Sequence, residues 1–522
     1  MDKFLAVQTL IIVLLLVVSV VAIAVRHLRV PYTVALVLVG LLITYQRPLE
    51  LSLTPELILS LFVPPLIFEA AFHLEFKSLR ENWLPIVVLA VPGVLLTTFI
   101  VGVIVSFGAG TSLLSGLVFG ALIAATDPVA VVAVFRSMGM PKRLTVLVES
   151  ESLFNDGTAI VLFQIMLAAA VAAGASAAES ANSGFSFPGA TVSFVFVSVG
   201  GLGVGAALGW LVSQISDRID DHLIETTLTT VLAFGSYLVA EQFHVSGVLA
   251  VVAAAVIMRN LGLKKMSPTT KIVLFNFWEY LAFITNSFVF LLIGSEVNVR
   301  QIFIYILPIS VALAAVLVSR ALVVYGLTYL SNLRGSKVPI VYQHVLFWGG
   351  LRGALSLALA LSLPVAFADR ELLRVMTFGI VLFTILVQGT TMQFLIRRLG
   401  IGRQPEVELE YERRYGRLLA AQSELRRVAE MHREGLISST TWEQVDEPLK
   451  EQIRDLLDAQ RQLIQAYPAL QSEEREDARL EGLRAKRATL TTLLSQNLIS
   501  DTVYEELLGE VDTALAKEVS RE

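Results

Sequence analysis

The segment Glu149-Ser-Glu-Ser-Leu-Phe-Asn-Asp156 lies inside a long apolar run that extends from Leu144 to Gly174. A charged side chain near the centre of a bilayer costs about 2.5–3.5 kcal/mol even on the mild insertion scale. Three carboxylates in one apolar run are therefore costly, and such residues usually mark an ion path, a proton relay or a structural ion pair. The segment points to transport of a small charged species.

The composition is that of a membrane protein with many spans. Of 522 residues, 55% are hydrophobic and 16% are charged, and the mean hydropathy is +0.70. Apolar stretches of about 20 residues, the length that spans a bilayer, recur along the sequence. The chain has no cysteine, which excludes disulfides and thiolate metal sites. The first apolar run, residues 4–25, is too long for the core of a signal peptide and lacks a small-residue cleavage site, so we expect a retained helix.

The chain changes character near residue 403. Residues 1–403 contain 24 Lys and Arg and 20 Asp and Glu, whereas residues 404–522 contain 16 and 25. The long apolar runs also stop at this point. We therefore predict a transmembrane domain over residues 1–403 and a soluble, acidic, mostly helical tail over residues 404–522.

The predicted fold class is an all-α polytopic membrane protein with about thirteen transmembrane helices. The spans are 4–25, 32–45, 56–74, 83–107, 112–136, 144–174, 190–215, 226–243, 245–260, 272–294, 302–330, 338–366 and 372–396. With the N-terminus outside, 17 loop Lys and Arg residues fall inside and five fall outside, as the positive-inside rule requires. This orientation places the tail in the cytosol and leaves Arg320 and Arg352 within spans.

Span 112–136 contains the sequence Thr126-Asp127-Pro128. Proline lacks an amide hydrogen and disfavours a helical conformation at the residue before it. We expect the helix to open here, which would free backbone carbonyls and a carboxylate near mid-membrane, as in the cation sites of many transporters. The alternative is a plain proline kink, which would leave an unpaired aspartate at a costly depth.

Span 144–174 is expected to present two polar faces. Ser152 and Asp156 are four residues apart, and Glu149 lies about two turns nearer the cytosol on nearly the same face. This face can hold an ion ligand, a hydroxyl and an acidic vestibule group. Glu149 could instead be a solvated residue at the start of the helix.

The other face of this span carries Glu151 and Asn155. We interpret Glu151 as a structural carboxylate that pairs with a buried cation, with Arg320 and Arg352 as the candidates. Arg352 lies in Trp348-Gly-Gly-Leu-Arg352-Gly-Ala-Leu-Ser356, where three glycines within six residues weaken the helix and allow close backbone approach. A second broken helix that crosses the one at Asp127 fits this pattern, and ordinary close helix packing is the alternative.

Six motifs occur in order between residues 10 and 400. They are Phe62-Val-Pro-Pro-Leu-Ile-Phe-Glu69-Ala-Ala-Phe, Ala125-Thr-Asp127-Pro-Val-Ala, Glu151-Ser-Leu-Phe-Asn-Asp156-Gly, Phe243-His-Val-Ser-Gly247-Val-Leu-Ala, Asn286-Ser-Phe-Val-Phe-Leu-Leu-Ile-Gly294 and Gly350-Leu-Arg352-Gly-Ala. Together they resemble the sodium/proton exchanger family, in its bacterial NhaP-type branch of monovalent cation/proton antiporters. The resemblance does not extend to the tail. It implies thirteen helices with inverted repeats, an ion-carrying core domain, a dimerisation domain, elevator-like movement and a homodimer.

The resemblance also implies roles for single residues. Asp156 matches the aspartate that binds the ion and the proton, Asp127 and Thr126 match the unwound-helix site, and Ser152 matches the hydroxyl ligand. Glu69 matches a carboxylate near the site in some members, and Asn155 precedes the aspartate as in members that resemble electroneutral exchangers. Glu151 matches a structural glutamate whose partner lies at Arg320, and Arg352 lies in the second broken helix.

The tail contains an internal repeat. Leu436-Ile-Ser-Ser-Thr440-Thr-Trp-Glu443 recurs as Leu498-Ile-Ser-Asp-Thr502-Val-Tyr-Glu505, and each copy has the Thr-to-Glu spacing of a capping box that begins a helix. We predict two helical hairpins. The basic cluster Arg397, Arg398 and Arg403 before an acidic stretch suggests contact with lipid or cytosolic loops, and a helical spacer that aids dimerisation is the alternative. No nucleotide-, calcium- or nucleic-acid-binding motif is visible in the tail, and we expect no cofactor.

Burial disfavours the charged form of a carboxylate, so Asp156 is expected to hold either a proton or a small cation. One site with two exclusive ligands and two orientations gives exchange of a monovalent cation for H⁺, with Na⁺ first and Li⁺ or K⁺ as alternatives. A single cycling carboxylate would make the exchange electroneutral. The alternative interpretation is a sodium-coupled symporter of an organic solute. An intramembrane aspartyl protease is disfavoured because its Gly-x-Gly-Asp pattern is absent, so we expect a transporter rather than an enzyme.

Overall fold

The computed structural model describes residues 2–25, 31–46, 57–174, 187–217, 219, 221–296, 299–333, 337–401 and 406–467, and also 475, 479, 482–483, 485–486, 488–494 and 498–519. Over these residues all regular secondary structure is helical. The chain divides into two compact units, Met1–Gly402 and Arg403–Glu522. The division falls next to the predicted domain boundary, and Arg403 itself lies outside the described residues.

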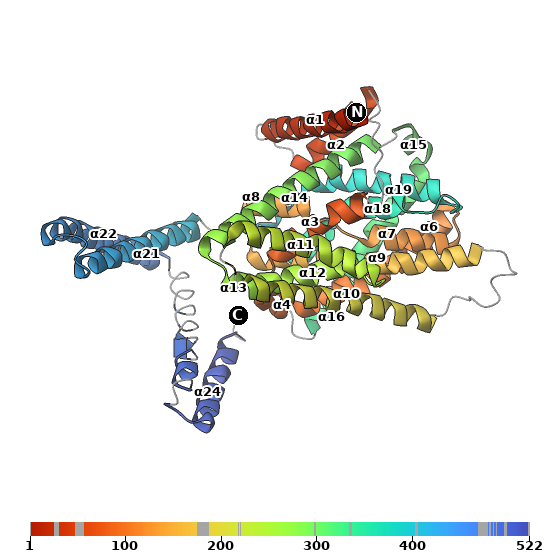
Figure 1. Ribbon diagram of the computed structural model, residues 1–522. Coiled ribbons are helices and arrows are strands. Elements are labelled where there is room, and N and C mark those ends of the chain that lie inside the picture. The colour runs from red at the N-terminus through yellow and green to blue at the C-terminus, as the bar shows by residue number, and fades with distance from the viewer. Residues whose placement is uncertain are drawn as a thin grey trace. The chain divides into compact units, whose positions relative to one another are not determined.

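Over its described residues, the first unit is built from α-helices and three π-helical segments, which are labelled η. Its elements are α1 (Asp2–Val25), α2 (Tyr32–Gln46), η1 (Leu57–Phe62), α3 (Val63–Phe72), α4 (Phe76–Glu81), α5 (Trp83–Ala90), α6 (Pro92–Ala109), α7 (Leu113–Ala124), α8 (Val129–Met138), α9 (Lys142–Gly174), α10 (Phe187–Ser216), α11 (His222–Gln242), α12 (Gly247–Ile257), η3 (Met258–Gly262), α13 (Leu263–Lys265), α14 (Pro268–Glu296), α15 (Val299–Ile304), α16 (Ile306–Leu333), α17 (Ile340–Trp348), α18 (Ala354–Leu361), α19 (Arg370–Phe383), η4 (Thr384–Gly389) and α20 (Thr390–Leu399) (Figure 1).

Eight helical stretches among the described residues are long and apolar enough to cross a membrane. They are 83–109, 113–138, 142–173, 188–216, 222–242, 269–295, 306–333 and 370–399. Four shorter apolar helices, over 12–25, 32–43, 58–72 and 247–262, coincide with further predicted spans. Predicted span 338–366 corresponds to the short pair α17 and α18. The prediction of a polytopic all-helical membrane protein is therefore confirmed.

The structure corrects the helix boundaries in detail. The predicted span 83–107 is divided at Val91 into α5 and α6. Pro92 begins α6, at a position where its missing amide hydrogen leaves no helical hydrogen bond unmade. The sequence patterns also gave no sign of the three π-helical segments, because a single inserted residue leaves the apolar pattern almost unchanged.

Close helix packing in the first unit relies on small residues, as is common in membranes. α2 and α14 pack at Gly40 and Gly294. A side-chain carbon added at Gly40 would collide with the Leu291 carbonyl oxygen, and one added at Gly294 would collide with that of Val37. Glycine at both positions therefore permits this backbone approach.

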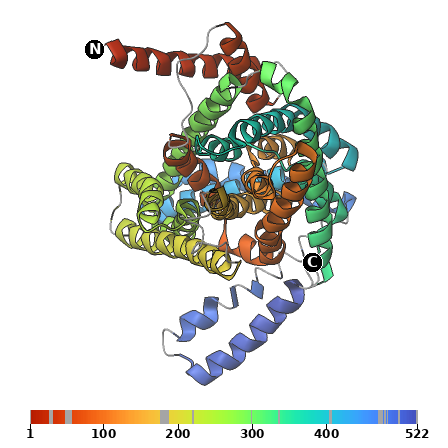
Figure 2. The same cartoon turned by 90° about the vertical axis from the view of Figure 1, so that its right-hand side faces the viewer.

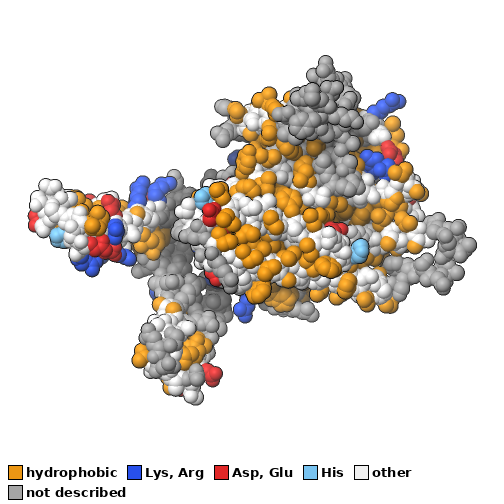
Figure 3. Space-filling model, in the orientation of Figure 1, with side chains coloured by type: hydrophobic (Ala, Val, Ile, Leu, Met, Phe, Trp, Pro, Cys, Tyr) orange, Lys and Arg blue, Asp and Glu red, His pale blue; other side chains and the backbone are white. Residues whose placement is uncertain are grey.

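The charged segment 149–156 lies on a central helix, α9. Viewed roughly along the helices, α9 runs near the middle of the first unit (Figure 2), where it packs against α5, α7, α10 and α12 among others. The face of the unit shown in Figure 3 carries many hydrophobic side chains and few charged ones. This arrangement suits a unit whose flank faces lipid and whose polar chemistry is internal.

The second unit contains a helical hairpin of α21 (Glu406–Arg433) and α22 (Ser439–Ala466), and also α24 (Asp501–Val519). Helix α22 is capped by Ser438, whose hydroxyl accepts a hydrogen bond from the Thr441 amide over 3.2 Å. The predicted cap at Thr440 is therefore wrong by two residues, because Ser438 already provides the extended backbone and the side-chain acceptor. Helices α22 and α24 nevertheless begin at equivalent positions of the repeat. The predicted second hairpin lies partly outside the described residues.

Candidate functional site

Two interrupted helices meet inside the first unit. Residues 125–128 are unwound between α7 and α8, and residues 349–353 are unwound between α17 and α18. The Asp127 amide donates a hydrogen bond to the Leu351 carbonyl oxygen over 2.8 Å, so the two unwound segments touch. Pro128 and the glycines of the second segment provide the local reason for both breaks.

Gly353 allows the closest approach in this crossing. A side-chain carbon added at Gly353 would collide with the carboxylate of Asp127. The same carboxylate accepts a hydrogen bond from the Val129 amide over 3.0 Å, at the first residue of α8. An anionic or hydrogen-bonded carboxylate is favoured at the start of a helix, where amide groups lack helical partners.

Arg352 binds the end of α7, on the other side of the break from α8. Its guanidinium donates to the carbonyl oxygens of Ala124 and Ala125 over 3.0 and 3.1 Å, at the C-terminal end of α7. A cation there satisfies carbonyl groups that the end of a helix leaves without partners. The Arg352 backbone amide in turn donates to the Thr384 hydroxyl over 3.1 Å, so η4 helps to hold the unwound segment.

Two polar side chains of helix α9, Ser152 and Asn155, contact the unwound segment. The Ser152 hydroxyl donates to the Thr126 carbonyl oxygen. The Asn155 amide nitrogen donates to the Ala124 carbonyl oxygen over 3.1 Å and to the Thr126 hydroxyl over 3.2 Å. These contacts orient the side of α9 that also carries Asp156.

Two side-chain oxygens at this position are buried without a protein partner. Among the described residues, Oδ1 of Asp156 and Oδ1 of Asn155 have no hydrogen-bond partner. A buried carboxylate oxygen is costly unless it is protonated, hydrogen-bonded or bound to a cation. The site therefore has an unused acceptor of the type that a hard cation or a proton would occupy.

A small cavity of about 100 Å³ joins these groups. Asp127, Asp156, Thr126 and Ser152 line it, and Glu69 and Glu149 complete its carboxylates. A larger cavity of about 700 Å³ shares Glu69 and Glu149 as lining residues. The two glutamates thus lie where the wider space meets the narrow one.

Glu151 is directed away from this cavity and forms an ion pair with Arg320. Arg320 Nη1 lies 2.7 Å from Glu151 Oε1, and Nη2 lies 3.1 Å from Oε2, so the pair is bidentate. Arg320 Nη2 also donates to the Leu346 carbonyl oxygen over 2.9 Å. Of the two arginines that the sequence left open, Arg320 is the partner.

The predicted site residues thus fall into two groups. The cavity lining includes the first group, namely Asp156, Asp127, Thr126, Ser152, Glu69 and Glu149. Asn155 lies beside it and contacts Thr126. Glu151, Arg320 and Arg352 are buried behind the cavity and hold the helices that form it.

Sequence reasoning missed several residues of the site. Asn286 and Ser356 line the small cavity, and Glu279 and Arg136 line the large one. Asn286 and Ser356 lie within two of the sequence motifs described above, but their spacing did not indicate a role in the site. Glu279 and Phe283 are four residues apart on α14, and both line the large cavity. This helical spacing, which places the two side chains on one face, was the only available indication of Glu279.

A membrane protein with crossed, interrupted helices around buried carboxylates belongs to the class of secondary transporters built on discontinuous helices. The family model described as "Sodium/hydrogen exchanger, transmembrane" matches residues 12–398. The chain belongs to this family. It is therefore a transporter and not an enzyme.

Individual relatives agree with the family match. The Na⁺/H⁺ antiporter ApNhaP of Aphanothece halophytica is 38% identical over 493 residues, which is 92% of this chain and 91% of the relative. A low-affinity Na⁺/H⁺ antiporter of Synechocystis is 37% identical over 454 residues, or 85% of this chain and 84% of that one. The family model ends at residue 398, as the resemblance predicted, whereas the match to ApNhaP covers 92% of the chain and so also includes part of residues 404–522.

A solved structure shows the same fold. The sodium proton antiporter of Methanocaldococcus jannaschii at pH 8 matches with a TM-score of 0.62 and 20% sequence identity, covering 76% of this chain and 99% of that one. At this identity the likeness concerns the fold alone.

Proposed function

We propose that this protein exchanges Na⁺ for H⁺ across the cell membrane, with Asp156 as the group that binds either ion. The observation that carries the proposal is the unpartnered Asp156 oxygen in a cavity that Asp127, Thr126 and Ser152 also line. Carboxylate, hydroxyl and carbonyl oxygens are the ligands that hard cations prefer. The names of the relatives described above support sodium as the cation, and they give no support to a symporter of an organic solute.

Competition for one carboxylate is sufficient to couple the two fluxes. A proton and a cation cannot occupy the same Asp156 oxygen, so loading one ion requires release of the other. Thr126 and Ser152 are positioned to contribute oxygens, and Asp127 adds negative charge at the helix break. Asn155 orients Thr126, while Glu69 and Glu149 guide cations from the wider cavity.

The exchange would be electroneutral if Asp156 alone changes its proton during the cycle. Asn155 carries no titratable proton, and Arg320 holds the charge of Glu151 through two hydrogen bonds. The Asp127 carboxylate accepts a hydrogen bond from the Val129 amide, which favours its ionised form. One H⁺ would then move for each Na⁺.

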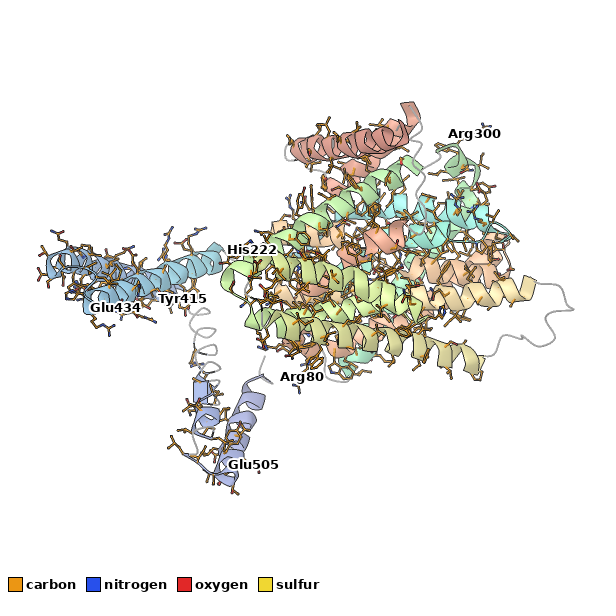
Figure 4. The ribbon with its side chains drawn as sticks, viewed as in Figure 1. Arg80, His222, Arg300, Tyr415, Glu434 and Glu505 are labelled. Carbon is orange, nitrogen blue, oxygen red and sulfur yellow. The ribbon has the colours of Figure 1, made fainter. Side chains whose placement is uncertain are left out.

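The proposed architecture has thirteen transmembrane helices in inverted repeats, with elevator-type movement in a homodimer surrounded by lipid. Two helix pairs that are both interrupted near their middle, and that touch at the breaks, support a repeat relation between the two halves. The N-terminus would lie outside and the tail in the cytosol. Arg80 and His222 lie toward one end of the helices and Arg300 toward the other (Figure 4), which supports a topology with the loops of Arg80 and His222 on one side and that of Arg300 on the opposite side.

The test is ion flux in liposomes that contain the purified protein. An imposed pH gradient should drive Na⁺ uptake, and Li⁺ and K⁺ in separate arms would define selectivity. Cation-dependent proton movement that is absent in empty liposomes supports the proposal. Movement of an organic solute with Na⁺, without any proton movement, would contradict it.

A further inference from the structure

A second buried carboxylate lies far along the chain from Asp156, in the first turn of α11. Glu225 is only 1% exposed. Its Oε1 accepts a hydrogen bond from the Ser216 hydroxyl over 3.3 Å, and its Oε2 has no hydrogen-bond partner among the described residues. Nothing in the exchange cycle uses this group, so its burial needs a separate explanation.

A second buried hydroxyl on α10 also has no partner among the described residues. Ser213 is fully buried, and its hydroxyl likewise has no partner in the described part of the chain. Ser213 lies three residues before Ser216 on α10, so both hydroxyls share one face of that helix. α10 packs against α11, which brings this face toward Glu225.

Backbone groups at both helix ends are hydrogen-bonded. At the start of α11, two amides donate to the Asp221 carboxylate, and they provide no hydrogen bond to Glu225 Oε2. At the end of α10, the Ser216 carbonyl oxygen accepts a hydrogen bond from the Ile219 amide over 3.2 Å. The oxygens that lack partners among the described residues here are therefore side-chain oxygens, those of Glu225 and Ser213.

In the next turn of α11, the buried polar side chain has hydrogen-bond partners. Thr229, one turn after Glu225, accepts a hydrogen bond from Trp278 Nε1 over 3.2 Å and donates to the Thr226 carbonyl oxygen over 2.8 Å. Thr229 and Trp278 are both fully buried. This turn is therefore well packed and hydrogen-bonded, whereas Glu225 Oε2 and Ser213 Oγ have no partner among the described residues.

We propose that Glu225, Ser213 and Ser216 form a structural site for one monovalent alkali cation, separate from the transport site. One carboxylate matches a single positive charge, and divalent cations such as Ca²⁺ usually require more carboxylate ligands. The start of α11 lies at an end of the helical bundle, as the labelled His222 shows (Figure 4), so the site is near a surface that ions can reach. A cation bound here would tie α10 to α11 and stabilise the folded protein.

The test measures thermal stability in detergent with the full chain. An Asp127→Asn/Asp156→Asn background removes the carboxylates of the proposed transport site. NaCl or KCl replaces choline chloride at constant ionic strength, and the melting temperature is followed by intrinsic fluorescence. We expect a saturable rise in melting temperature with an alkali cation, because a ligand that binds only the folded state stabilises it.

Variants locate the site. Glu225→Gln should abolish the rise, and Ser213→Ala should increase the half-saturating cation concentration severalfold without stranding a charge. Glu241→Gln, an exposed carboxylate at the other end of α11, should leave the rise unchanged. If Glu225→Gln does not fold, the half-saturating cation concentration of Ser213→Ala tests the proposal by itself.

Three results would overturn the proposal. The first is equal melting temperatures in alkali and choline salts. The second is a rise that persists in Glu225→Gln or is unaffected by Ser213→Ala. The third is a saturable rise with Mg²⁺ or Ca²⁺ only.

Discussion

Glu151 and Arg320 are the two most clearly paired charges inside the first unit. Both are buried, with side-chain exposures of 3% and 8%, and they share two hydrogen bonds. Removing one partner of such a pair strands the other charge and costs about 3–5 kcal/mol. Their arrangement gives them a structural role that differs from that of Asp156, whose Oδ1 has no partner among the described residues.

Glu151→Gln should therefore lower the melting temperature more than Asp156→Asn does. Asp156→Asn removes a charge that has no ion-pair partner, so its effect on stability should be small or even favourable. The double variant Glu151→Leu/Arg320→Met, which strands no charge, should recover part of the loss. Equal melting temperatures for the two single variants would count against the structural role.

Asp127 and Asp156 line the same cavity and should both be required for exchange. We expect Asp127→Asn and Asp156→Asn each to abolish Na⁺/H⁺ exchange in liposomes while the protein remains folded, because each removes a charge at nearly constant volume. Glu241→Gln, outside the cavity, is the matched control and should retain exchange. Near-normal flux in the Asp156→Asn variant would exclude Asp156 as the ion-binding residue.

At the scale of elements, the crossing of the two unwound segments depends on a missing side chain. Gly353 lies against the Asp127 carboxylate, whereas Gly326 on α16 has open space where a side-chain carbon would lie. Gly353→Ala should reduce exchange by at least about tenfold, a change of roughly 1.4 kcal/mol in the activation free energy. Gly326→Ala should retain the normal rate. Equal rates for the two variants would show that the crossing tolerates displacement.

The sequence indicated the two breaks because Pro128 and the glycines act locally on the backbone. It also indicated the face of α9 that carries Ser152 and Asp156, because helical spacing fixes which residues are neighbours. It could not indicate that Asn286 or Glu279 would join the cavity, since that depends on how α14 packs against distant helices. The choice between Arg320 and Arg352 likewise depends on tertiary packing, which brings Arg320 of α16 to Glu151 of α9 and to the Leu346 carbonyl oxygen of α17.

At the scale of the whole molecule, the cavity and its lining residues belong to the first unit. The second unit should therefore modulate exchange rather than perform it. Deletion of residues 410–522 should leave exchange in liposomes but shift its pH dependence or its maximal rate. Complete loss of flux from a well-folded truncated protein would place the second unit within the transport machinery.

The stoichiometry is also a property of the whole cycle. If only Asp156 exchanges its proton, no net charge crosses the membrane, and flux should not respond to an imposed potential. The potential can be set with potassium and valinomycin once K⁺ transport has been excluded. A steep voltage dependence would mean that a second proton moves, with Asp127 or Glu69 as the first candidates.

The central claim is that Na⁺ and H⁺ compete for Asp156. The most direct test is how the apparent KM for Na⁺ depends on pH. Initial exchange rates are measured over a range of Na⁺ concentrations while the pH is varied on the side of the membrane from which Na⁺ enters. Competition predicts that the apparent KM rises as the pH falls, by up to about tenfold for each pH unit once the carboxylate is mostly protonated, while the rate at saturating Na⁺ is unchanged. An apparent KM that stays constant while the saturating rate falls would contradict competition at a shared site.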